Sequence, residues 1–137
     1  MQETDMRRWF AAVAILLASQ MPLAGLTAQA TAPETVSVEL SNFKFTPSAL
    51  ALQSGHLYRL HLVNAAGGGH DFSAPEFFSA SAIAPEDQAK VVGGKVKLEG
   101  KQTVDITLTP QKAGTYPLTC THFMHSGMGM KGQITVG

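Results

Sequence analysis

The sequence predicts an all-β domain, an antiparallel sandwich or barrel, that follows an N-terminal export signal. Short runs of alternating apolar residues recur from Val36 to Val136, and alternation of period two places such side chains on one face of a sheet. Turn-forming residues separate the runs. The first thirty residues differ from this pattern, since they carry basic residues followed by an apolar run. We therefore consider them apart from the domain.

Residues 1–30 have the pattern of a secretory signal peptide. Arg7-Arg8 forms a short basic region, residues 9–19 form the apolar run, and Ala28-Gln29-Ala30 has the small residues of a cleavage site. We expect a signal peptide over residues 1–30 and one domain over residues 31–137. The chain would then function in the periplasm or be otherwise exported.

Two features of this leader leave alternatives open. Gln20 and Pro22 interrupt the apolar run and make it short for a membrane span, so we expect no stable membrane insertion; an uncleaved anchor is the alternative. Arg7-Arg8 also resembles part of a twin-arginine signal. The choice between this route and general secretion stays open.

Composition limits the function of the predicted domain. Removal of 30 residues from the 137 leaves 107, which suits one compact domain. These residues contain eight basic and eight acidic side chains, so they lack the basic surface of a nucleic-acid-binding protein, and we expect little electrostatic steering of a partner. An exported domain with one cysteine has no internal disulfide, so Cys120 is inert, intermolecular or functional.

The expected strands follow one another along the domain, and we count seven or eight of them. Turns are expected at Gln53-Ser54-Gly55, Glu99-Gly100 and Lys112-Ala113-Gly114. In chain order, the alternating sets are Val36/Val38/Leu40, Phe43/Phe45, Tyr58/Leu60/Leu62, Val96/Leu98, Val104/Ile106/Leu108, Tyr116/Leu118/Cys120 and Ile134/Val136.

Two segments interrupt the alternation. Gly67-Gly68-Gly69 predicts a loop that leads directly to His70. Residues 76–89 lack alternation and contain a helix-like run before Pro85. This segment predicts a short helix or an irregular crossover between the sheets.

Soft metal-binding side chains are concentrated in residues 120–130. A thiolate, imidazoles and a thioether together favour copper over hard cations, and a single cysteine argues against a structural zinc site. Methionine that served only as a core filler would be scattered through the strands. The side chains concerned are Cys120, His122, Met124, His125, Met128 and Met130, and every methionine after residue 30 is among them.

The expected strands give these side chains a plausible arrangement. Cys120 ends one strand, and the loop before the next strand carries His125 and Met130. His70 would add a ligand from a distant segment, since it follows the glycine loop at a strand end. Two histidines, one cysteine and a weak axial methionine form an electron-transfer copper site.

Several motifs resemble the cupredoxin family over nearly the whole predicted domain. Ser41-Asn42-Phe43-Lys44-Phe45-Thr46-Pro47 is similar to the opening strands, and Gly69-His70-Asp71-Phe72 resembles the segment of the first histidine ligand. Gly114-Thr115-Tyr116 resembles the strand that precedes the copper loop. The resemblance implies a Greek-key β-sandwich that holds one copper ion, cycles it between Cu(I) and Cu(II), and transfers one electron in an exported compartment.

The copper loop resembles two branches of this family. The four-residue spacing between Cys120 and His125 is similar to azurin, whereas His125-x-x-Met128-Gly129-Met130 is similar to pseudoazurin, whose second methionine is axial. We therefore favour Met130 as the axial ligand, with Met128 as the alternative. Asp71 stands where many members have an asparagine that ties the copper loop. An ionised carboxylate donates no hydrogen bond, so this side-chain support is in doubt.

The other histidines are not expected to bind the metal. His122 shares strand phase with Cys120 and is assigned to the surroundings of the site or to the surface. His56 and His61 are expected at solvated strand positions.

Two functions from different classes fit these residues. The first is an electron carrier, a monomer without enzymatic activity, whose redox partner protein docks on an apolar rim formed by Phe123, Met124 and Met128. The second is copper trafficking or resistance, for which Met124 and Met128 supply additional thioether donors. An oxidase or nitrite reductase would need further histidines for additional copper ions, and few remain unassigned. A domain without metal is a further alternative, which the complete ligand set disfavours.

Overall fold

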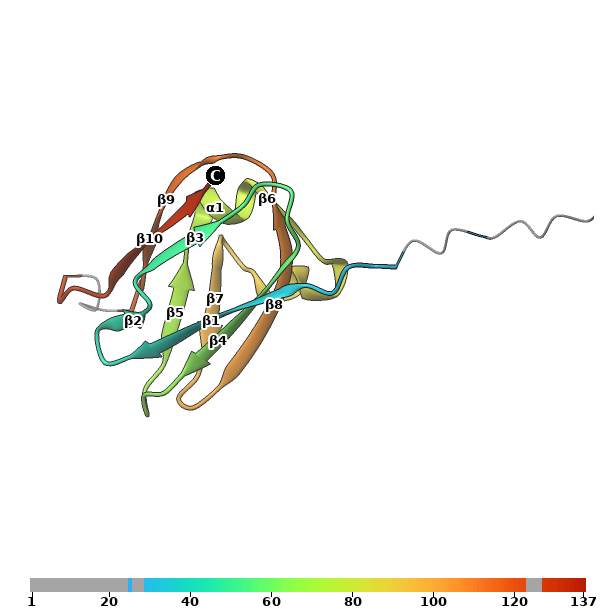
Figure 1. Cartoon of the computed structure of the whole chain (residues 1–137). Coiled ribbons are helices and arrows are strands. Elements are labelled where there is room, and N and C mark those ends of the chain that lie inside the picture. Colours follow the sequence, from blue (N-terminus) through green and yellow to red (C-terminus); the bar gives the residue numbers. More distant parts are fainter. Residues whose placement is uncertain (1–24, 26–28, 123–126) are drawn as a thin grey trace, which may run out of the picture.

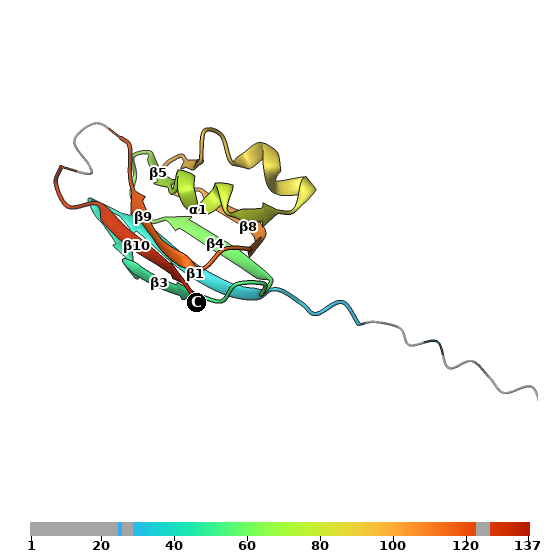
Figure 2. The same cartoon turned by 90° about the horizontal axis from the view of Figure 1, so that it is seen from above.

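The fold is a sandwich of two five-stranded β-sheets, shown in two views in Figures 1 and 2. The computed structural model describes residues 25, 29–122 and 127–137. Two segments discussed above lie outside this range. They are the leader, apart from Gly25, Gln29 and Ala30, and residues 123–126, which include His125. Across the described residues, no helix has the length and apolar character to cross a membrane.

One sheet has the strand order β2-β1-β4-β8-β6. In this sheet β1 and β4 pair in parallel, and all other neighbouring strands pair antiparallel. Its strands are β1 (Glu34–Ser41), β2 (Lys44–Thr46), β4 (Tyr58–Asn64), β6 (Ser81–Ile83) and β8 (Thr103–Pro110).

The second sheet has the order β3-β10-β9-β5-β7. β3 and β10 are parallel, and the other neighbours are antiparallel. Its strands are β3 (Ala49–Leu52), β5 (His70–Ser73), β7 (Lys95–Leu98), β9 (Gly114–Thr119) and β10 (Lys131–Val136). The neighbours β1 and β4, and β5 and β9, are distant in sequence, so the chain crosses between the sheets as the predicted sandwich requires.

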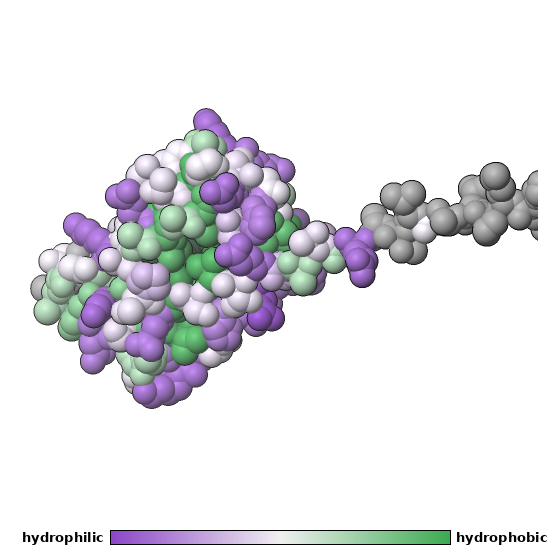
Figure 3. Space-filling model, viewed as in Figure 1, coloured by the Kyte–Doolittle hydropathy of each residue, from purple (hydrophilic) through white to green (hydrophobic). Residues whose placement is uncertain are grey.

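The core lies between the sheets and follows the predicted alternation. The inward-facing residues of β4 and β8, including Leu60, Leu62, Ile106 and Leu108, are almost fully buried. Aromatic rings join the short strands to this core, since the Phe72 ring contacts Phe45 with a centroid separation of 6.0 Å. Figure 3 shows apolar residues on the surface among polar ones, as is normal for a globular domain.

The described residues form ten strands, where the sequence analysis expected seven or eight. The added strands are short, and β5 is the most informative of them. All four residues of β5 are buried, so it lacks the alternation of a strand with one solvated face. The two parallel pairs also depart from a purely antiparallel arrangement.

The segment predicted as a helix or crossover contains both kinds of structure. α1 (Pro75–Ser79) and a 3₁₀ helix (Pro85–Lys90) flank β6. Asp87 anchors the 3₁₀ helix to β8, because its carboxylate accepts a hydrogen bond from the Thr107 backbone N–H at 2.7 Å. Within the helix, the same carboxylate accepts a hydrogen bond from the Lys90 ammonium at 2.6 Å.

The Asp87 carboxylate makes the free energy of unfolding depend on pH in the acidic range. Burial acts to raise the pKa of its carboxyl, but the hydrogen bonds from Lys90 and Thr107 outweigh burial and bring the pKa below the ordinary value of 3.8. A lowered folded-state pKa stabilises the fold above the unfolded-state value, and this contribution is lost as the pH falls through the folded-state pKa.

We expect Asp87→Asn to lower the free energy of unfolding near neutral pH by about 1–3 kcal/mol. Urea denaturation of both proteins at neutral pH and below pH 3.8 measures this, and the difference should shrink in acid. An equal difference at both pH values would contradict the assignment.

Candidate metal centre

The adjacency of β5 and β9 brings together two residues that are 50 positions apart. His70 begins β5, Cys120 directly follows β9, and the strands pair at Ser73 and Thr119. The Nδ1 atom of His70 lies 3.8 Å from the Sγ atom of Cys120. Both side chains are buried.

Met130 lies on the other side of Cys120. It directly precedes β10, and its backbone carbonyl accepts a hydrogen bond from the Cys120 N–H at 3.3 Å. The Met130 side chain is fully buried, whereas Met128 is 56% exposed. The sequence analysis left both methionines as axial candidates, and of the two only Met130 has its side chain in the interior.

The fourth expected ligand, His125, lies outside the described residues. Within the described part of the chain, no three His, Cys, Asp or Glu side chains form a potential metal-binding group. The described part of the site contains the His70 imidazole and the Cys120 thiol side by side, with Met130 next to Cys120.

These donors fit a soft or borderline metal ion. Imidazole nitrogen and thiolate sulfur bind such ions at about 2.0–2.3 Å, so a separation of 3.8 Å allows one ion to contact both without movement of the strands. A thiolate with a thioether selects Cu(I), and imidazole also suits copper. The residues present therefore fit the copper ion that the sequence motifs imply.

Asp71 connects the two segments that carry His70 and Cys120. Its carboxylate accepts a hydrogen bond from the Thr121 backbone N–H at 2.7 Å and another from the Thr121 hydroxyl at 2.5 Å. The sequence analysis doubted this support because a carboxylate donates no hydrogen bond. That doubt was wrong, because both groups of Thr121 donate to Asp71.

The same residue contacts the candidate ligand sulfur through its backbone. The Asp71 N–H points to the Cys120 Sγ atom at 3.5 Å. Burial raises the pKa of the Cys120 thiol above its ordinary value of 9.0, and the Asp71 charge acts in the same direction. Backbone N–H groups of Asp71 and His122 and the charge of Lys95 oppose this increase. The metal-free thiol is therefore protonated at neutral pH, and metal binding as thiolate releases a proton.

Asn64 orders the glycine loop that leads to His70. Its side-chain amide, almost fully buried, donates to the Gly68 carbonyl at 2.8 Å and to the Glu99 carbonyl at 3.0 Å. The loop also packs closely, since a Cβ atom at Gly100 would lie 2.1 Å from the Gly67 carbonyl oxygen. Sequence reasoning missed Asn64, although an asparagine shortly before a glycine run is a recognisable loop signal.

The remaining histidines divide into two groups. The His122 ring lies near the site, 6.3 Å from the His70 ring between centroids, as expected for a residue around the metal centre. The Nδ1 atom of His61, which is partly exposed, lies at hydrogen-bond distance, 2.6 Å, from the Oδ1 atom of Asp105. His56 pairs with Glu34 at 2.9 Å, and it precedes β4 rather than lying in a strand as expected.

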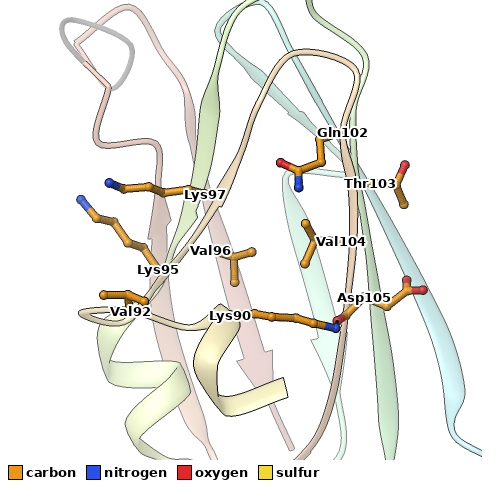
Figure 4. Close-up of a pocket in the computed structure, with 9 residues that line it drawn as sticks. All are labelled: Lys90, Val92, Lys95, Val96, Lys97, Gln102, Thr103, Val104 and Asp105. Carbon is orange, nitrogen blue, oxygen red and sulfur yellow. Dashed lines mark hydrogen bonds between the residues drawn. The ribbon is translucent and has the colours of Figure 1, made fainter. Parts of the chain in front are cut away.

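A cavity of about 580 Å³ lies elsewhere, at the open edge between β7 and β8. Figure 4 shows Val96 and Val104 facing each other across it, with Gln102 above and Lys90 directed toward Asp105. Its lining includes no histidine, cysteine or methionine. This cavity is therefore separate from the candidate metal centre.

We expect Asp71→Ala to destabilise the metal-free protein by about 1–3 kcal/mol, because two hydrogen-bond donors of Thr121 lose their acceptor. Asp71→Asn keeps one acceptor oxygen and should lose less. Urea denaturation of the metal-free variants measures both changes. Equal stabilities of the alanine variant and the native chain would show that Asp71 does not connect these segments.

Comparisons with known proteins agree with this architecture. A family model described as a cupredoxin-like domain matches residues 9–136. No match was found among curated protein sequences.

Solved structures with a similar fold include three auracyanins. An auracyanin B is 22% identical with a TM-score of 0.57, over 79% of this chain and 92% of that one. A dithionite-reduced auracyanin from Roseiflexus castenholzii is 19% identical with a TM-score of 0.59, over 78% and 99%. Auracyanin A from Chloroflexus aurantiacus, described as a blue copper protein, is 18% identical with a TM-score of 0.56, over 77% and 100%. At these identities the likeness concerns the fold.

Proposed function

The chain belongs to the cupredoxin-like family, and on this basis we propose that it is a one-electron carrier with one copper ion bound by His70, Cys120, His125 and Met130. The observation that supports this most directly is the 3.8 Å approach of the His70 and Cys120 donor atoms in a buried site. Auracyanin A, which shares the fold, is described as a blue copper protein.

In this proposal the copper ion supplies the change of oxidation state, and the protein keeps its ligands in place. His70 and Cys120 lie at the ends of paired strands, and the Cys120 N–H bond to Met130 fixes the third segment. The Asp71 N–H directed at Sγ stabilises the thiolate. A ligand set that moves little between two oxidation states favours fast electron transfer.

We place the carrier in the periplasm or another exported compartment, with residues 1–30 as a cleaved signal peptide. The support is the basic, apolar and small-residue order of the leader. The carrier acts as a monomer, exchanges electrons with a redox partner protein, and is not itself an enzyme.

Copper trafficking is the second candidate function. The observation that favours it is the exposed Met128, a thioether that lies two residues from the buried Met130 and that suits Cu(I). The Cu(I) stoichiometry separates the two functions. One ion per chain supports the electron carrier, and further ions bound through the methionine loop support trafficking.

We expect the copper(II)-loaded protein to show an intense visible charge-transfer band, and Cys120→Ser to abolish it, because the band requires a thiolate ligand. Absorption spectroscopy after addition of one equivalent of copper(II) tests this. A band that survives in the serine variant would exclude Cys120 as the copper ligand.

We expect Met130→Leu to shift the reduction potential and the visible spectrum of the copper protein, because the buried thioether is the proposed axial ligand. Met128→Leu is the matched control and should leave both nearly unchanged. Voltammetry and absorption spectra of the two variants make the comparison. The reverse pattern would assign the axial position to Met128.

A further inference from the structure

The fold separates charges that the sequence balances. Residues 31–137 contain eight basic and eight acidic side chains, and the sequence alone therefore predicted little steering of a partner. The strand registers allow each charge to be placed relative to the strand ends near His70 and Cys120. We call this part of the molecule the ligand end. It includes the C-terminal ends of β1, β4, β7 and β9, the N-terminal ends of β2, β5, β8 and β10, and the side chains that contact Thr121 beside Cys120.

Three lysines lie beside the candidate ligands. Lys97 is exposed and pairs in register with Asp71 across β5 and β7. The Lys95 ammonium donates a hydrogen bond to the Thr121 hydroxyl at 3.1 Å, next to Cys120. Lys131 is exposed and directly follows Met130.

Two further lysines complete the positive charge of the ligand end. Lys44 pairs with Ser41 where β1 ends, and the Lys101 backbone N–H binds the Ala66 carbonyl of the loop before His70. The exposed acidic residues of the same end are Glu39 and Glu99. Asp71, the remaining acid, is buried and accepts hydrogen bonds from Thr121. With Asp71 counted, five lysines stand against three acidic residues, a formal excess of two positive charges at the ligand end.

The rest of the domain, in which Asp105 lies level with the middle of β4, therefore has the reverse imbalance, with three basic against five acidic residues. Its basic residues are Arg59, Lys90 and Lys112, and its acidic residues are Glu34, Glu76, Glu86, Asp87 and Asp105. Residues 123–126 contain no lysine, arginine, aspartate or glutamate. This distribution of formal charge therefore does not depend on their placement.

We propose that the ligand end is a positively charged docking surface that selects an acidic patch on the redox partner protein. The inference rests on the proposed electron-carrier function, because an electron must enter or leave close to the copper ligands. Charges are screened over about 8–10 Å at physiological salt. A partner that approaches this end therefore responds to the local excess of positive charge rather than to the zero net charge of the chain.

Small redox reagents of opposite charge test the sign of this surface. In stopped-flow kinetics, oxidation of the reduced copper protein by the hexacyanoferrate(III) anion should slow at least about threefold between about 10 mM and about 200 mM salt. Oxidation by the tris(phenanthroline)cobalt(III) cation should accelerate over the same range. Salt dependence that is absent, or of the same sign for both reagents, would overturn the proposal.

Matched lysine variants locate the effect. Lys97→Gln removes one charge at the ligand end and should weaken the salt dependence with the anion. Lys112→Gln removes one charge from the rest of the domain and should leave it nearly unchanged. Equal effects of the two variants would mean that the net charge of the protein, rather than the ligand end, determines the rate.

A binding measurement keeps this inference separate from the proposed function. In NMR titrations with hexaglutamate, amide shifts should concentrate near Lys44, Lys97 and Lys131, and shifts around Lys112 instead would overturn the proposal. A protein that neither reagent oxidises, yet that binds hexaglutamate at the ligand end, would contradict electron transfer but keep the acidic-partner surface. Stronger binding to phosphatidylglycerol vesicles than to hexaglutamate would reassign the surface to a membrane.

Discussion

Two hydrogen bonds from Thr121 to the buried carboxylate of Asp71 hold together the segments on which the metal centre depends. The β5–β9 ladder pairs Ser73 with Thr119. Two residues further along the same register, the Asp71 side chain takes the Thr121 N–H and hydroxyl as partners, so the connection continues past the end of β9. His70 and Cys120 flank this connection, and their 3.8 Å approach follows from it.

Burial explains why this geometry suits a metal ion. Burial raises the pKa of the Cys120 thiol, so the neutral thiol is favoured until a bound cation stabilises the thiolate. The same burial keeps water from His70, Cys120 and Met130, and the surrounding strands resist displacement. One rigid arrangement of strand ends therefore underlies the copper-binding proposal. Asn64 orders the loop before His70 at this end, and the Met130 side chain is buried there.

Much of this was predictable from the sequence. The alternation in β1, β4, β8, β9 and β10 predicted the sandwich, because each of these strands has one buried face. It could not predict β5, which is buried throughout, or the two parallel pairs, which depend on contacts between distant segments. Donor chemistry indicated His70, Cys120 and Met130, but the role of Asp71 depends on which groups of Thr121 face it. The separation of charge between the ligand end and the rest of the domain depends on the topology, and a linear count of zero conceals it.

The central claim is that the buried site carries one electron reversibly on one copper ion. Cyclic voltammetry of the copper-loaded protein tests this most directly, with the copper content of the same sample determined by elemental analysis. The account predicts a reversible one-electron couple at one copper ion per chain, with the copper retained in both oxidation states. A protein that releases copper on reduction, or that shows no reversible couple although copper is bound, would contradict it.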